Sequence, residues 1–209
     1  MGVKCVPRIG PEAGKSGRYL RRIVCRTGAG FSWQADPKHV DTIIKLLGLE
    51  GAKPADTPGS RTTGVGVRDA LDPLVGQELK LFPQVAGLVN YLAADRPDIQ
   101  YALKCVLADM HSPCVISMAR LKRIGRYLAG RPVLEWLYPL QELPKRAVYQ
   151  TDSDWGEDKV TRKSTTSCYG YFGQHLLETH VSGQAVMSLP CRLKKRSSTL
   201  SAREHRAAS

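Results

Sequence analysis

The chain has 209 residues, enough for one large domain or two small ones. Its 31 lysines and arginines outnumber 19 aspartates and glutamates, which gives a formal charge of +12, and 42% of its residues are hydrophobic. This composition permits a hydrophobic core, argues against disorder throughout and favours a polyanionic partner, although a basic chain can also be merely soluble and basic.

Cysteine spacing gives no signal for a metal site or a disulfide framework. The six cysteines are scattered along the chain, and none forms a C-x-x-C pair. The N-terminus is polar, and no apolar run approaches membrane-spanning length, so we expect no signal peptide, no transmembrane segment and no membrane partner. An intracellular location, cytoplasmic or nuclear, is the default expectation.

Glycines and a proline interrupt the first part of the chain, so we expect a disordered N-terminus over residues 1–16. Gly14-Lys15-Ser16 does not qualify as a phosphate-binding loop, because no apolar strand leads into it. Residues 17–26 and 31–34 then predict two strands that a glycine-containing turn joins into a hairpin.

The clearest local signal is a helix that begins at Asp36-Pro37. Asp36 can cap it, Pro37 suits its first position, and four apolar residues follow at helical spacing, namely Val40, Ile43, Ile44 and Leu47. Gly48 is expected to end it. The hairpin and this helix form a unit over residues 17–50, and an exposed linker over 51–77 follows, rich in glycine, proline, threonine and aspartate.

Residues 78–130 carry three amphipathic helical patterns that we expect to pack as a small bundle. Asp95-Arg96-Pro97 and Ser112-Pro113 separate them. The third pattern has four basic residues, Arg120, Lys122, Arg123 and Arg126, which are candidate phosphate contacts. A solvated helix face would carry the same charges, so this pattern alone does not decide between phosphate binding and simple solvent exposure.

After residue 131 the pattern changes to strands, and we place a domain boundary there. Strands are predicted at 133–138, 147–151 and 168–172, and an extension of the last strand to residue 177 stays open. The second leads into Asp152-Ser-Asp154-Trp155, and a turn with Arg162 and Lys163 comes before the third. A carboxylate at a strand end beside a basic turn can hold a divalent cation and an anionic polymer, but acidic turns after strands are also common on surfaces.

Several motifs, in their order and spacing, resemble the polyprotein of copia-type LTR retrotransposons. The main ones are Trp33-Gln-Ala-Asp-Pro-Lys-His-Val40, Tyr91-Leu-Ala-Ala-Asp-Arg-Pro-Asp-Ile-Gln-Tyr-Ala102, Met110-His-Ser-Pro113, Leu121-Lys-Arg-Ile-Gly-Arg-Tyr-Leu128, Thr151-Asp-Ser-Asp-Trp155 and Arg162-Lys-Ser-Thr165. The likeness covers about residues 17–189 and corresponds to the end of the reverse transcriptase and the N-terminal part of its ribonuclease H domain.

The resemblance implies an α+β chain, with a hairpin and a helical thumb-like or connection-like segment that holds an RNA·DNA hybrid. A truncated ribonuclease H-like α/β sheet would follow over 131–209. In that fold, carboxylates hold two Mg²⁺ ions about 4 Å apart. Asp152 matches the metal ligand on the first strand, Asp154 a turn or supporting residue, and Trp155 a core residue. Arg162 and Lys163 join the helix residues as candidate nucleic-acid contacts.

The chain departs from the family pattern where the next metal-binding glutamate is expected. One register places Lys195 there, and the other places Arg206 there, with Glu204 two positions early as a catalytic candidate. The paired aspartates of the polymerase are absent, and the family's remaining aspartates would lie beyond Ser209. This leaves Asp152 as the one firm acidic ligand. Because Mg²⁺ gives up its waters reluctantly, a single carboxylate cannot hold two such ions, so we expect this chain alone to be catalytically incomplete and not to bind Mg²⁺ stably.

Three hypotheses remain open. The chain is an incomplete polyprotein fragment that works with the remainder of the polyprotein, a non-catalytic basic module that binds nucleic acid, or a pseudogene product that does not fold to its end. The last follows from the unpaired edge that a truncated sheet exposes. The abrupt basic turn after Leu189 also leaves open a shifted reading frame over 190–209.

Overall fold

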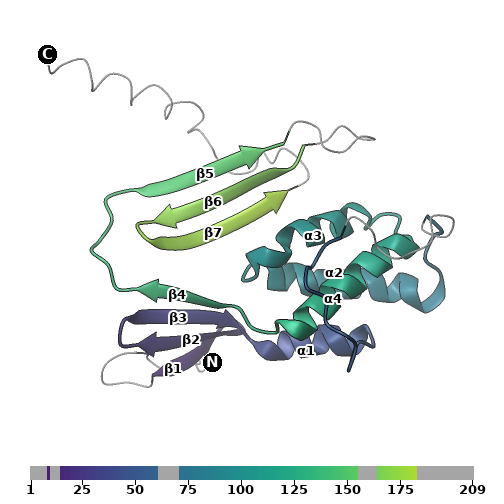
Figure 1. Ribbon diagram of the computed structural model, residues 1–209, viewed down its shortest axis with the longest axis horizontal. Helices are drawn as coiled ribbons and strands as arrows, with labels where there is room; N and C mark the ends of the chain where they lie inside the picture. The colour runs from purple at the N-terminus through teal and green to yellow at the C-terminus, as the bar shows by residue number, and fades with distance from the viewer. Residues whose placement is uncertain (1–8, 10–14, 61–70, 155–163, 183–209) are drawn as a thin grey trace, which may run out of the picture.

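The computed structural model describes residue 9 and residues 15–60, 71–154 and 164–182 of the chain, which has an α+β architecture (Figure 1). Two antiparallel sheets, ordered β1-β2-β3-β4 and β5-β6-β7, lie on one side of the molecule, and the helices lie on the other. The predicted α+β class is therefore confirmed.

The first sheet begins with β1 (Ser16–Tyr19), β2 (Arg22–Thr27) and β3 (Gly30–Ala35). The predicted hairpin is present as β2 and β3. The expectation of one continuous strand over 17–26 is wrong, because Leu20 and Arg21 form a turn with φ angles of 47° and 60°. Residues other than glycine seldom adopt positive φ, so the sequence carries no ordinary turn signal at this point.

Contacts from outside this turn hold its backbone. The Tyr91 hydroxyl donates to the Leu20 carbonyl oxygen at 3.1 Å, and the Asp36 amide donates to the Arg21 carbonyl oxygen at 3.1 Å. Both bonds come from helix-forming parts of the chain, so the position of the turn depends on tertiary structure.

Strand β4 (Glu135–Pro139) completes the first sheet by pairing with β3. The sequence predicts that residues 131–209 form the ribonuclease H-like unit. In the structure, however, β4 belongs to the sheet formed by the N-terminal strands. At Gly30 the two strands approach so closely that a Cβ atom would overlap the Tyr138 carbonyl oxygen and lie 2.8 Å from the Pro139 Cα. This pairing joins segments that are far apart in sequence, which local patterns do not reveal.

Helix α1 (Pro37–Leu46) forms as the sequence predicts. The Asp36 side chain accepts a hydrogen bond from the Lys38 amide at 3.1 Å, and Pro37 occupies the first turn. Gly48 follows the helix with a φ of 62°, the left-handed conformation that commonly ends helices at glycine.

The remaining helices are α2 (Gly76–Ala93), α3 (Pro97–Ala108) and α4 (Val115–Gly130), and the predicted breaks separate them. They share one apolar core with α1, so the bundle has four helices in the described chain instead of three. The core residues include Val40, Ile43, Phe82, Val85, Val89, Leu92, Ile99, Leu103, Val106, Leu121, Ile124 and Leu128. None of these helices, within the described residues, is long and apolar enough to cross a membrane.

The second sheet is a meander of β5 (Ala147–Ser153), β6 (Thr166–Phe172) and β7 (His175–Ser182). An extension of the strand 168–172 to residue 177 is wrong, because Gly173, with a φ of 62°, turns the chain back into the antiparallel β7. Gln100 on α3 joins it to the helices, because its side-chain amide donates to the Thr179 carbonyl oxygen at 3.1 Å and contacts the Thr179 hydroxyl at 2.8 Å. Every residue of β5 is exposed, and within the described residues its second edge has no partner strand.

Candidate functional site

Asp152 lies one residue before the end of β5, opposite Ser167 on β6. Its side chain is exposed, and its Oδ1 accepts a hydrogen bond from the Ser153 amide at 2.9 Å. The predicted strand therefore carries this carboxylate to its end.

Asp154 has a different role. Its Oδ1 accepts a hydrogen bond from the Thr165 amide at 2.8 Å, while its own amide donates to the Thr165 carbonyl oxygen at 3.0 Å. These bonds join the two ends of the β5-β6 connection. Asp154 is thus held by structural contacts, as the predicted turn residue would be.

The other predicted site residues, Trp155, Arg162, Lys163 and Glu204, lie outside the described residues. Within the described residues, no group of three or more histidine, cysteine, aspartate or glutamate side chains could hold a metal ion. A metal site at Asp152 consequently stays a prediction from the sequence.

The predicted basic residues of α4 all have partners in the chain. Arg120 pairs with Asp109 at 3.1 Å, Lys122 with Glu78 at 2.9 Å, Arg123 donates to the Thr57 hydroxyl at 2.9 Å, and Arg126 donates to the Lys53 carbonyl oxygen at 2.8 Å. These contacts fasten α2, the end of α3 and the segment around residues 53–57 to α4. A phosphate would have to compete with them.

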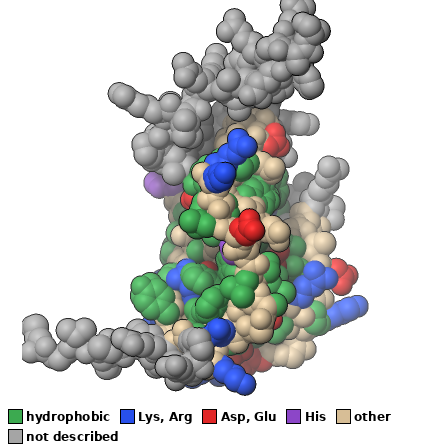
Figure 2. Space-filling model, turned by 90° about the vertical axis from the view of Figure 1, so that its left-hand side faces the viewer, with side chains coloured by type: hydrophobic (Ala, Val, Ile, Leu, Met, Phe, Trp, Pro, Cys, Tyr) green, Lys and Arg blue, Asp and Glu red, His purple; other side chains and the backbone are tan. Residues whose placement is uncertain are grey.

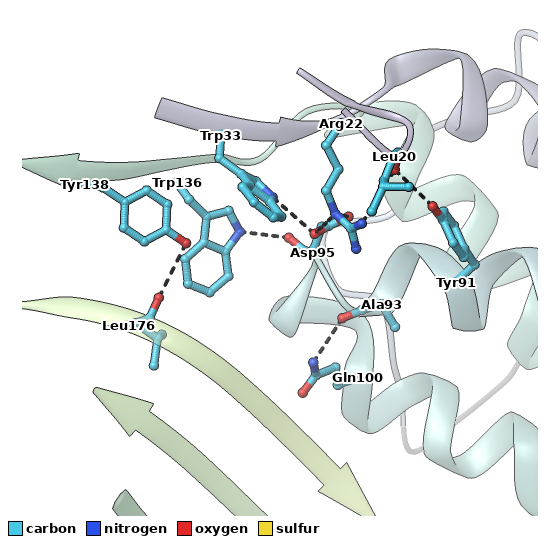
Figure 3. Close-up of polar contacts among 10 residues, drawn as sticks. All are labelled: Leu20, Arg22, Trp33, Tyr91, Ala93, Asp95, Gln100, Trp136, Tyr138 and Leu176. Carbon is cyan, nitrogen blue, oxygen red and sulfur yellow. Dashed lines mark hydrogen bonds and ion pairs between the residues drawn. The ribbon is translucent and has the colours of Figure 1, made fainter. Parts of the chain in front are cut away.

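The sequence marks Asp95 as part of a helix break and of a family-like motif but gives it no site role, yet the residue has a central structural position (Figure 3). Its carboxylate accepts hydrogen bonds from Arg22 Nε at 2.8 and 2.9 Å and from Trp33 Nε1 at 3.1 Å. Its carbonyl oxygen accepts one from Trp136 Nε1 at 2.8 Å. We call these four residues the Asp95 cluster, which attaches the first sheet to the end of α2.

The next residue, Arg96, is 2% exposed and forms a second polar cluster. Its guanidinium binds both Asp98 carboxylate oxygens and donates to the Arg131 carbonyl oxygen at 2.8 Å. Burial opposes the ionisation of Asp98, but the hydrogen bond and charge of Arg96, with a bond from Tyr127, leave its pKa below the ordinary 3.8. The sequence signal for this cluster is the run Asp95-Arg96-Pro97-Asp98, which places charged residues in a break between two apolar helices.

A cleft of about 440 Å³ lies where the two sheets meet the junction of α2 and α3, and we call it the aromatic cleft. Its lining residues are Phe31, Trp33, Ala94, Asp95, Trp136, Tyr138, His175, Leu177 and Thr179. Burial and the nearby charge of Asp95 raise the pKa of Tyr138. On the sheet side of the molecule, Figure 2 shows hydrophobic side chains at the surface with lysine and arginine side chains around them.

Comparison with known proteins shows what the chain is similar to. The chain is 37% identical over 91 residues to the Retrovirus-related Pol polyprotein from transposon RE1 of Arabidopsis thaliana, and 34% identical over 91 residues to that from transposon RE2. Each match covers 44% of the chain but 6% of the polyprotein. The chain is therefore related to a segment of retrotransposon Pol polyproteins, which confirms the copia-type resemblance seen in the sequence.

A third relative matches more of the chain. The Uncharacterized mitochondrial protein AtMg00810 of Arabidopsis thaliana is 29% identical over 170 residues, which is 81% of the chain and 69% of that protein. No family model matches the chain, and no solved structure matches it.

Proposed function

We propose that the chain corresponds to the end of the reverse transcriptase and the N-terminal part of the ribonuclease H domain of a copia-type Pol polyprotein. In this proposal it binds RNA·DNA hybrid or other nucleic acid and does not complete metal-dependent cleavage by itself. The position of Asp152 at the end of β5 carries the proposal, because a ribonuclease H-like sheet would present its first metal ligand there.

The charges of the chain support incomplete catalysis. Two-metal cleavage needs several carboxylates around ions about 4 Å apart. In either register of the family's next ligand the sequence has a basic residue, Lys195 or Arg206. A lone exposed carboxylate such as Asp152 competes poorly with the water shell of Mg²⁺.

The net charge of +12 supports the binding of a nucleic acid. Each neutralised phosphate releases counterions, so affinity should fall steeply with salt. Because Arg120, Lys122, Arg123 and Arg126 have internal partners, their removal should weaken α4 packing as well as any phosphate contact.

The test uses the full chain with a fluorescent RNA·DNA hybrid. Anisotropy over a salt series should give binding with a negative slope of log affinity against log salt, and gel analysis with Mg²⁺ should show intact RNA. Asp152→Asn should bind the hybrid as the parent chain does. Cleavage of the RNA that disappears in Asp152→Asn would contradict catalytic incompleteness, and absence of hybrid binding at low salt would contradict the nucleic-acid role.

A basic module that binds nucleic acid through α4 is the second candidate function, and variants of the Lys122–Glu78 ion pair test it. If α4 is the binding surface, Lys122→Gln should lower hybrid affinity, since this side chain is 41% exposed. Glu78→Gln, which removes its partner, should raise the affinity. A pseudogene product would instead give insoluble or protease-sensitive protein.

A further inference from the structure

The aromatic cleft owes its shape to two aromatic pairs on one face of the first sheet. Phe31 lies opposite Tyr138, and Trp33 lies opposite Trp136, on the neighbouring strands β3 and β4. Residues directly opposite one another share a face, so these side chains form two adjacent rows. Both indole N–H groups bond to Asp95, at 3.1 and 2.8 Å, which fixes the position of the tryptophan rings (Figure 3).

The other wall of the cleft is β7, which contributes His175, Leu177 and Thr179. The volume of the aromatic cleft, about 440 Å³, falls within the usual range of small-ligand sites. Two of its apolar lining residues remain in contact with solvent, since Phe31 is 40% exposed and Leu177 is 61% exposed. The cleft thus offers aromatic and apolar surface that the fold itself does not cover.

One basic residue on the same sheet face could serve an anionic ligand, although it is not among the residues that line the cleft. Arg26 on β2 lies opposite Phe31, so it shares the face and row of Phe31 and Tyr138. The acidic lining residue, Asp95, is 5% exposed and is paired with Arg22 at 2.8 Å. A ligand with a planar ring and a neighbouring phosphate matches this arrangement, because rings stack on aromatic side chains and phosphates pair with arginine.

We propose that the aromatic cleft binds an unpaired base of single-stranded nucleic acid, with Arg26 contacting an adjoining phosphate. A duplex cannot use this site in the same way, because its bases are stacked on one another and their faces are not available. The proposal rests on the nucleic-acid role proposed above and adds a separate single-strand site to it.

The experiment compares labelled oligothymidine with the labelled RNA·DNA hybrid on the full chain. The chain has three tryptophans, so a Trp155→Phe background leaves Trp33 and Trp136, both of which line the cleft, as fluorescence reporters. Oligothymidine should quench this fluorescence as it binds. Phe31→Ala should weaken oligothymidine binding about tenfold and leave hybrid affinity unchanged.

Two further variants test stacking against folding. Phe31→Leu keeps an apolar side chain without a ring and should lose nearly as much affinity as Phe31→Ala. Leu137→Ala is the matched control, because Leu137 is 69% exposed and lies between Trp136 and Tyr138 on β4 but points to the opposite face. It should bind oligothymidine as the parent chain does. Denaturation midpoints of all three variants show whether each one folds.

The outcomes separate the two proposals. Oligothymidine binding that neither quenches the tryptophans nor depends on Phe31 would overturn the cleft site and leave the nucleic-acid role standing. If the full chain binds oligothymidine with quenching of the tryptophans but does not bind the RNA·DNA hybrid, the hybrid role is overturned and the cleft site stands. Tryptophans that neither acrylamide nor oligothymidine quenches would show that another part of the chain fills the cleft, which would also overturn this proposal.

Discussion

The guanidinium Nε of Arg22 lies 2.8 and 2.9 Å from the two carboxylate oxygens of Asp95, so one ion pair joins β2 to the end of α2. Both side chains are largely removed from solvent, with 18% and 5% exposure. The same carboxylate also orients Trp33, and its backbone carbonyl orients Trp136. The Asp95 cluster therefore connects the attachment of the first sheet to the shape of the aromatic cleft.

Asp95→Asn should destabilise the chain by about 3 kcal/mol, because it leaves the guanidinium of Arg22 without its anion in a largely buried site. Chemical denaturation would measure the change. Asp36→Asn is the matched control, since Asp36 pairs with the 61% exposed Arg18 at 3.6 Å and asparagine caps helices well. A control change as large as that of Asp95→Asn would contradict this account.

Asp98→Asn should destabilise the chain at neutral pH by about 2 kcal/mol, since it weakens the charge-assisted bonds to the buried Arg96. The pKa of Asp98 is below 3.8 in the folded chain, so its ionised form contributes fully above the unfolded-state value. That contribution is lost as pH falls through the lower, folded-state pKa. Denaturation at several pH values should show a constant difference above about pH 5 that narrows in acid.

Gly30→Ala should separate β3 from β4, because the new methyl group would overlap the Tyr138 carbonyl oxygen and approach the Pro139 Cα. We expect a loss of about 2–3 kcal/mol in the free energy of unfolding. Gly28→Ala is the control, since nothing lies within 4 Å of the position that its methyl group would occupy. Equal stability of the two variants would argue against the β3-β4 register.

Asp154→Ala should lower stability by about 1 kcal/mol, because the Thr165 amide loses its acceptor. Asp152→Asn should change stability by less than about 0.5 kcal/mol, since Asp152 is exposed and asparagine keeps an oxygen for the Ser153 amide. Thermal unfolding of the two variants would measure both changes. The opposite order would mean that Asp152 has structural contacts besides this one.

Local signals explain which parts of the fold the sequence could predict. Asp36, Pro37 and Gly48 define α1 through capping and backbone preference, and the apolar spacing of α2, α3 and α4 indicates their buried faces. The strand that carries Asp152 followed from the apolar run before it. These features depend on residues that are close together in the chain.

The remaining features depend on distant residues. The Leu20-Arg21 turn has neither glycine nor asparagine, and its backbone is held by Tyr91 and Asp36. The pairing of β4 with β3, and the bonds from both tryptophans to Asp95, also require the folded chain. The sequence predicts the α4 arginines as candidate phosphate contacts or as a solvated helix face, but their bonds to Thr57 and Lys53 cannot be read from helical spacing.

The turn between β1 and β2 has one more consequence. Its left-handed backbone at Leu20 and Arg21 is imposed by neighbours that come from outside the hairpin. A synthetic peptide of residues 15–35 would lack Tyr91. In such a peptide β1 should therefore not pair with β2, even if β2 and β3 remain paired. Nuclear Overhauser contacts between Gly17 and Val24, which are partners in the intact chain, would be missing from such a peptide.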